Sequence, residues 1–293
     1  MTLKKEKTKE QEDKVQQKKI DKEIEKAETS EKDTAKSHGE ILREQLSHAQ
    51  DTYNKSPQSI LLSSLTAGLE IGFSYLMICT LFYFLTGKLA EDTVFKMIAF
   101  VYPLGFILVV LGQSILFTEQ TALLTLPVLN KKRSVPSLLK IWGLVISGNL
   151  IGGYLIALVL LWLGPSLHLF DLTVVEKIAK HVLDFNVGVI FASAILAGWL
   201  MGLLSWLLAS SRDTISRIVI IFLITAVMAF TGLHHSIIGS VEIFAGMLSS
   251  PDISLGDYLT FQGTALLGNA FGGAIFVALL KYRAFVFNVI AKN

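Results

Sequence analysis

Long apolar runs dominate the chain after residue 57. Six of them have the roughly 20 helical residues that are needed to cross a hydrocarbon core about 30 Å thick. They occupy residues 59–86, 95–129, 137–163, 183–209, 215–248 and 258–285. The second and fifth runs are the ones with polar clusters in their middle, GQSILFTEQT and TGLHHSIIGS. We therefore predict six transmembrane helices, of which the second and fifth are broken near the membrane midplane.

A short pattern occurs twice and relates the two halves of this apolar region. It reads GNLIGG at residues 148–153 and GNAFGG at residues 268–273. Each half has three spans with the break in the middle one, so the second half runs inverted through the membrane. Inverted repeats of discontinuous helices place a permeation site where the two breaks meet. We expect the small residues of the repeated pattern to serve close helix packing.

Composition separates a charged N-terminal segment from the apolar body. Residues 1–55 hold half of the 26 basic and just over half of the 24 acidic side chains, although the whole chain is 52% hydrophobic with a net charge of +2. This split excludes a water-soluble globular enzyme for the body, and the charge gives no reason to expect a nucleic-acid partner. We predict a cytoplasmic tail over 1–57, partly helical or disordered, and a six-helix channel domain over 58–293. Residues 40–53 are expected to form its ordered helix.

Basic residues gather in alternate loops and indicate the orientation. They follow the second, fourth and sixth spans, and they are Lys131, Lys132, Arg133, Arg212, Arg217, Lys281 and Arg283. The positive-inside rule then predicts cytoplasmic N- and C-termini in a multi-pass protein of the inner or plasma membrane. The longest loop, between the third and fourth spans, is expected to hold a short interfacial helix.

Polar residues inside the two interrupted runs are the candidates for chemistry, because ionisable groups in membrane spans are rare and mark pathways. They include Gln113, Thr118 and Glu119 in the second run, and His234, His235 and Ser236 in the fifth. Histidine titrates near neutral pH and suits a conduit whose solute gains or loses a proton. No triad, phosphate loop or metal-ligand spacing appears, so we predict no catalytic residue, metal or cofactor.

Four sequence pieces in order resemble the formate/nitrite transporter family over residues 57–285. They are Thr66-Ala67-Gly68, Leu116-Phe117-Thr118, Gly148-Asn149-Leu150-Ile151-Gly152 and Gly232-Leu233-His234-His235-Ser236-Ile237. The resemblance implies an aquaporin-like six-helix protomer, a homopentamer, and transport of small anions with protons. Its central pore histidine matches His235, and the loop threonine facing that histidine matches Thr118. Further implied positions are the apolar constrictions and a vestibule lysine, at Tyr102, Phe106, Leu116, Met228 and Lys180.

The chain departs from the family pattern at several positions. His234 stands where many members have an acidic residue, and Gly239 stands where they have asparagine. Ile115 and Gly198 replace an acidic residue and an asparagine, and Glu70 replaces an apolar one. These departures leave the identity of the solute open and indicate a divergent branch of the family. Some of the departing residues and the polar residues of the breaks are secondary candidates for contact with the solute, and they are His234, Ser236, Glu70, Gln113 and Glu119.

The sequence thus favours a membrane channel or transporter for formate-like or nitrite-like monovalent anions, proton-coupled through His235. Two alternatives stay open at this point: a pore for a different neutral or charged solute, and a non-conducting membrane scaffold or sensor whose tail binds a partner. Whether His235 donates the proton or stays neutral is also open. Glu242 is an intramembrane carboxyl that could line the pore or serve the structure.

Overall fold

The protein is described by a computed structural model that covers residues 2–26 and 35–291, with side chains from Gln11 onward. The elements of these residues are helices, which in chain order are α1 (Thr2–Lys26), α2 (His38–Asn54), α3 (Pro57–Leu85), α4 (Glu91–Met97), η1 (Ile98–Phe100), α5 (Pro103–Leu111), α6 (Phe117–Leu129), α7 (Val135–Ser166), α8 (Leu172–Leu183), α9 (Val187–Ser210), α10 (Thr214–Thr231), α11 (Ser236–Ser249), α12 (Leu255–Phe271), η2 (Gly272–Leu279) and α13 (Leu280–Ala291).

Six helical stretches within the described residues are long and apolar enough to cross a membrane. The second and fifth end early, at Leu111 and Thr231, and each is followed by a shorter apolar helix, α6 or α11. The predicted all-helical fold with six spans, broken in the second and fifth, is confirmed. The expected helix in the third-to-fourth loop is α8.

Polar residues begin the spans because the first backbone N–H groups of a helix lack partners within it. Ser56 caps α3, with Pro57 at the first helical position, and Asn186 caps α9. Asp213 caps α10 in the same way. The end of α10 uses Gly232, whose left-handed φ of 68° suits a residue without a Cβ.

The repeated glycine pattern brings equivalent helices together in each half. A Cβ on Gly152 of α7 would lie 2.1 Å from the Leu65 carbonyl oxygen of α3. A Cβ on Gly272, where α12 passes into η2, would lie 2.1 Å from the Ile195 carbonyl oxygen of α9. The same backbone contact therefore joins α3 to α7 and α9 to α12, as expected for an internal repeat.

The sixth span differs from the uninterrupted α-helix that the sequence suggests. Gly272 to Leu279 form a π-helix, and the helical stretch continues to Ala291. Gly273 lies so close to α6 that a Cβ there would be 2.0 Å from Thr121 Oγ1. The apolar pattern of residues 258–285 does not distinguish a π-helix from an α-helix, because both bury the same kinds of side chain.

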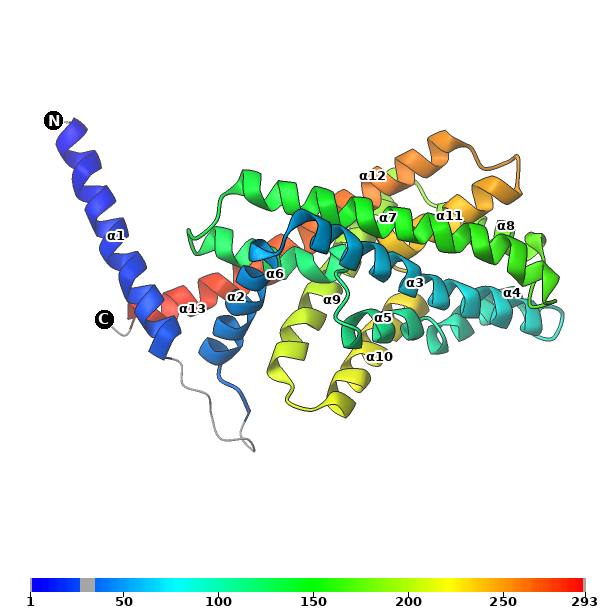
Figure 1. Cartoon of the computed structure of the whole chain (residues 1–293), viewed down its shortest axis with the longest axis horizontal. Coiled ribbons are helices and arrows are strands. Elements are labelled where there is room, and N and C mark those ends of the chain that lie inside the picture. Colours follow the sequence, from blue (N-terminus) through cyan, green and yellow to red (C-terminus); the bar gives the residue numbers. More distant parts are fainter. Residues whose placement is uncertain (1, 27–34, 292–293) are drawn as a thin grey trace.

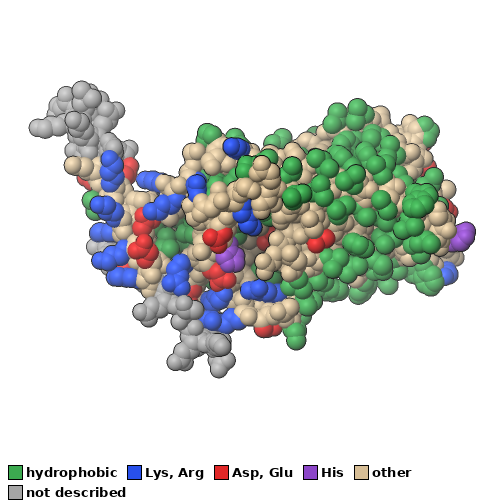
Figure 2. Space-filling model, viewed as in Figure 1, with side chains coloured by type: hydrophobic (Ala, Val, Ile, Leu, Met, Phe, Trp, Pro, Cys, Tyr) green, Lys and Arg blue, Asp and Glu red, His purple; other side chains and the backbone are tan. Residues whose placement is uncertain are grey.

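The molecule is elongated, with α1, α2 and α13 at one end and α4 and α8 at the other (Figure 1). We call these the tail end and the distal end. Lys, Arg, Asp and Glu side chains crowd the tail end, whereas apolar side chains cover much of the remaining visible surface (Figure 2). This distribution is that of a membrane-spanning body with a charged extension in water.

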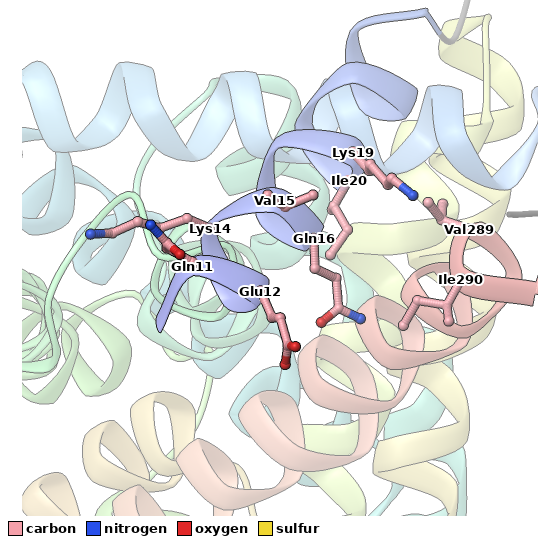
Figure 3. A pocket seen from close by; sticks show the side chains of 9 residues that line it. All are labelled: Gln11, Glu12, Lys14, Val15, Gln16, Lys19, Ile20, Val289 and Ile290. Carbon is pink, nitrogen blue, oxygen red and sulfur yellow. The ribbon is translucent and has the colours of Figure 1, made fainter. Parts of the chain in front are cut away.

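The N-terminal helices contact the tail end of the body. Leu42 of α2 is fully buried, and Gln45 donates from its amide to the Ser205 carbonyl oxygen of α9 at 3.0 Å. Ile20 of α1 shares an apolar cluster with Val289 of α13. A cavity of about 690 Å³ between these two helices is shown in Figure 3.

Candidate functional site

Two sharp turns bring the chain back into the body after α5 and α10. Gln113 at the first turn has φ = 59°, and Gly232 at the second has φ = 68°. The left-handed region is costly for a side chain such as glutamine, so the tertiary structure must hold the first turn in place. Both turns thus contain a residue with left-handed φ, and the half-helices α6 and α11 each begin four residues after it.

Asn149 of α7 holds the first break. Its side-chain oxygen accepts the Phe117 N–H of α6 at 2.8 Å. Its amide nitrogen donates to the carbonyl oxygens of Ser64 at 2.8 Å and Ile115 at 2.9 Å. Unpaired backbone groups at membrane depth cost several kcal/mol each, so this one buried side chain satisfies the two break groups, the Phe117 N–H and the Ile115 carbonyl oxygen, while its third bond anchors it to α3.

Asn269 of α12 holds the second break in the equivalent way. Its oxygen accepts the Ser236 N–H at 2.8 Å, and its amide nitrogen donates to the carbonyl oxygens of Ala194 and His234. The small residues of the repeated pattern predict close helix packing, but the pattern was not expected to brace the breaks through its asparagines. A buried amide at equivalent positions of both repeats was the signal that could have revealed it.

His235 and Thr118, from opposite half-helices, meet at the centre. The Thr118 hydroxyl and His235 Nε2 are 2.7 Å apart, and both residues are buried. His235 Nδ1 accepts from the backbone N–H groups of Ile237 and Ile238, at 3.3 and 3.5 Å. Because Nδ1 accepts, Nε2 carries the proton of the neutral ring and donates to Thr118. The imidazole therefore has no spare N–H.

The aromatic and aliphatic side chains that the resemblance places at the constrictions lie beside this pair, and we call this group of residues the closure. Phe106 of α5 presents its ring to His235 edge-on, with the centroids 5.2 Å apart, and stacks on Tyr102 at 5.2 Å. Leu116 and Met228 are fully buried, and so is Phe106. The structure thus brings together the expected central pair and the residues expected to constrict the path.

A cavity of about 490 Å³ lies on the distal side of this closure. Its lining includes Tyr102, Met228 and His235 from the centre, and Lys96 and His181 from the distal end. Lys96 Nζ donates to the Phe230 carbonyl oxygen at 2.8 Å. Burial lowers the pKa of His181, whose ring stacks on Phe95.

Lys180, the expected vestibule lysine, does not line this cavity. Its ammonium group pairs with Asp252 at 2.7 Å and with Glu176 at 2.6 Å. The bond to Asp252, followed by that to Glu176, raises the pKa of Lys180. The residue after it, His181, faces the cavity instead, because neighbouring helix positions point about 100° apart.

A second cavity, of about 630 Å³, lies on the tail side of the closure. Gln113 and Glu119 line it from the first break, with Arg217 of α10 and Lys55 beyond α2. Glu119 accepts from the Gln120 amide at 3.1 Å. The body therefore contains two cavities with the Thr118–His235 pair and its apolar neighbours between them.

The remaining secondary candidates take separate places. His234 donates from Nε2 to the Val182 carbonyl oxygen at 3.2 Å, and its Nδ1 lies 2.8 Å from Ser193 Oγ, so it ties the second break to α8 and α9. Ser236 is fully buried and its hydroxyl has no partner among the described residues. Glu70 lies beside Gly112 at the first break and lines neither of these two cavities.

Gly239, where the family pattern has asparagine, faces α12. A Cβ there would be 2.5 Å from the Phe261 ring, which fills the space of a side chain. Gly198, another departure, leaves room for the Asn269 backbone, whose carbonyl oxygen would lie 2.2 Å from a Cβ. Within the described part of the chain, no group of three His, Cys, Asp or Glu residues could hold a metal ion.

Comparison with known proteins agrees with this architecture. The chain is 29% identical to the "Inner membrane protein YfdC" of Escherichia coli (strain K12) over 234 residues, which is 78% of this chain and 72% of that protein. A solved "FNT family ion channel" superposes with a TM-score of 0.74 at 24% identity, covering 83% of this chain and 98% of the other.

A solved "Pentameric formate channel with formate bound" also has this fold. It superposes with a TM-score of 0.67 at 20% identity, covering 78% of this chain and 98% of the channel. The family model described as "Formate/nitrite transporter" matches residues 39–283, from α2 to α13. This multi-pass membrane protein, with its paired half-helices and central Thr118–His235 contact, belongs to the formate/nitrite transporter family of anion channels and transporters rather than to an enzyme family.

Proposed function

We propose that the chain conducts formate-like monovalent anions through the membrane, each accompanied by a proton. The observation that carries the proposal is the Thr118–His235 pair, which lies between two cavities at the ends of two half-helices. The N-terminal ends of α6 and α11 carry partial positive charge toward this centre, which favours an anion there. The amide N–H groups of Thr118 and Glu119 have no acceptor among the described residues.

The apolar closure supports proton coupling. A bare carboxylate that passes Tyr102 and Phe106 loses its hydration and gains no charge–charge attraction from these two uncharged, stacked side chains. Such a transfer costs far more than a transport cycle sustains, so the solute crosses as the neutral acid. Its protonation must therefore precede the constriction on the way in.

The hydrogen bonds favour a neutral His235 over one that donates to the solute. Its Nε2–H is directed to Thr118, and its Nδ1 lone pair receives backbone N–H groups. The Thr118 hydroxyl, which accepts from His235, keeps its own proton available for a passing solute. In this account His235 orients Thr118 and the solute receives its proton elsewhere.

Counterflow of labelled formate into proteoliposomes at pH 5 and pH 7.5 tests the proposal. We expect saturable flux in the parent and at least a tenfold loss in His235→Ala and Thr118→Ala, because each removes half of the central pair. Thr80→Ala is the matched control, since that hydroxyl bonds only within α3, to the Leu76 carbonyl oxygen. Absence of formate flux in a folded parent would refute this solute class and leave a different solute or a scaffold role.

We propose a homopentamer, with the tail end in the cytoplasm. Large apolar side chains are exposed on the spans, among them Trp162, Leu223 and Leu267 at 71, 56 and 68%. The fold of the pentameric formate channel supports the stoichiometry, and the basic loop at 131–133 lies with the tail. Native mass spectrometry should give five copies of the 32.2 kDa chain. A dominant monomer or tetramer in mild detergent would refute the pentamer.

A further inference from the structure

Glu242 is a buried carboxyl that the central pair does not use. It lies in α11, is 8% exposed, and lines the distal cavity together with His235 and Tyr102. It is seven residues after His235, so it lies about two turns, roughly 10 Å, farther toward the distal end. Among the described residues, no hydrogen bond or ion pair engages its carboxylate.

The surroundings of Glu242 are poor in positive charge. Its nearest titratable neighbours are the phenols of Tyr75 and Tyr102 and the thiol of Cys79. The Tyr75 hydroxyl is itself buried without a conventional partner. Other titratable or charged groups that line the cavity are Asp92, Lys96, His181, His234 and His235. Those on the helices packed against α11 are Glu176, Lys177 and Lys180 on α8, Glu70 and Tyr83 on α3, Glu119 on α6, Lys140 and Tyr154 on α7, and Asp257 and Tyr258 on α12.

Two cations of the distal end are engaged elsewhere. Lys96 donates to the Phe230 carbonyl oxygen, and Lys180 is held by two carboxylates on the rim. An isolated carboxylate that is largely shielded from water and has no cation partner is costly, and the uncharged acid avoids that cost. Glu242 therefore has the form of a carboxylic acid with a free O–H, next to the path and before the constriction.

We propose that Glu242 donates the accompanying proton to the anion. This proposal rests on the function proposed above. An anion in the distal cavity accepts the Glu242 O–H in a hydrogen bond between a carboxylic acid and a carboxylate. The proton then moves from Glu242 Oε to the solute oxygen, which gives a neutral acid and a glutamate anion. The neutral acid passes Tyr102 and Phe106, and hydronium from the distal aqueous phase reprotonates Glu242.

The transfer reverses for movement in the other direction, because the same two oxygens exchange the proton. Thr118 and His235 then guide an already neutral solute, which agrees with the absence of a spare N–H on His235. The donor lies outside the constriction, where water reaches the cavity to restore the proton.

Flux and proton uptake in Glu242→Gln test the proposal. Glutamine keeps the size of the glutamate side chain and can still form hydrogen bonds through its amide, but it has no proton that it can transfer to the solute. We expect parent flux at pH 7 to fall at least tenfold in Glu242→Gln. The residual flux should rise about tenfold for each unit by which the pH falls, because it follows the concentration of the neutral acid in bulk water. For a solute with a pKa near 4, this neutral form is about a thousandth of the total at pH 7. The parent should depend less steeply on pH.

Glu91→Gln is the matched control, because Glu91 is an exposed distal-end carboxyl that pairs with Lys177 at 2.8 Å. It should leave flux unchanged. Parent-like flux and pH dependence in Glu242→Gln would overturn the role of Glu242 while leaving anion transport intact. Absence of flux in the parent would overturn anion transport and the role of Glu242 together.

A second measurement uses only the parent protein, so it still tests the proposal if the Glu242→Gln variant does not fold. Dicyclohexylcarbodiimide reacts with protonated carboxyl groups in apolar surroundings. We expect it to modify Glu242 at pH 7, as located by peptide mass spectrometry, and formate to slow the modification at least threefold. Glu91 should stay unmodified. No modification of Glu242, or modification that formate does not slow, would overturn the proposal.

Discussion

At the scale of single residues, the centre depends on side chains that satisfy backbone groups as much as on those that face the path. Asn149 and Asn269 each bond one N–H and two carbonyl oxygens across a break. Asn149 holds the backbone next to Thr118 in place, and Asn269 holds the backbone on either side of His235, because bonds of each asparagine go to backbone groups next to these residues in the chain.

Removing either asparagine should destabilise the fold. We expect Asn149→Ala and Asn269→Ala to lower the free energy of unfolding by about 3 kcal/mol each, because each removes three buried hydrogen bonds and leaves one N–H and one carbonyl oxygen at the break without a partner. Thermal or denaturant unfolding in detergent measures the loss. Similar losses at both positions are expected from the repeat. A cost below about 1 kcal/mol at either position would contradict this bracing role.

At the scale of elements, helix contacts follow from the size of residues at the crossings. A Cβ on Gly68 of α3 would lie 2.2 Å from the Asn149 carbonyl oxygen of α7. A Cβ on Gly198 of α9 would lie at the same distance from the Asn269 carbonyl oxygen of α12. Small residues let the backbones approach, which apolar attraction alone does not achieve among lipid tails. The two halves use this device at equivalent positions.

Adding a methyl group at a crossing should separate the helices. Gly68→Ala should destabilise the protein by about 2 kcal/mol, since the clash is with backbone that cannot rotate away. Gly143→Ala is the matched control on α7, where a Cβ meets nothing within 4 Å. That change should be neutral or stabilise by up to about 1 kcal/mol. Equal effects of the two substitutions on the melting temperature would refute the crossing argument.

At the scale of the whole molecule, the charged tail joins the body through α2. His38 donates from Nε2 to the Lys281 carbonyl oxygen at 3.1 Å and packs edge-on against Trp206. Burial against this surface lowers the pKa of His38 from its ordinary value of 6.5. The docked form therefore favours a neutral histidine at the junction of tail and body.

Acid should loosen this junction. The pKa of His38 is lower when it is docked than when it is free, so docking is fully stabilised above pH 6.5. That stabilisation is lost as the pH falls through the docked value. Hydrogen exchange over residues 38–54 should be faster at pH 5.5 than at pH 7.5 after correction for intrinsic rates. His38→Gln should remove most of the difference. An unchanged difference in that variant would assign the effect to another group.

Much of this architecture can be predicted from the sequence because its cause is local. Six apolar runs, polar clusters in the second and fifth, and the repeated GN..GG pattern follow from what a hydrocarbon solvent tolerates along a helix. They indicate the six spans, both breaks and the inverted repeat. The pairing of Thr118 with His235 came from family resemblance, and their 2.7 Å contact agrees with it.

Other features depend on contacts between distant segments, which no local pattern contains. Lys180 reaches Asp252 because α8 packs against α11, in addition to its local pair with Glu176 one turn earlier, and His181 takes the place at the cavity. The asparagine braces, the π-helix at Gly272 and the isolation of Glu242 are likewise set by neighbours far along the chain. Which segments cross the membrane and where they break can be read from composition along the chain, since burial in lipid selects apolar side chains. Which polar side chains are paired and which line a cavity follows from the packing of helices, because hydrogen-bond partners meet in three dimensions.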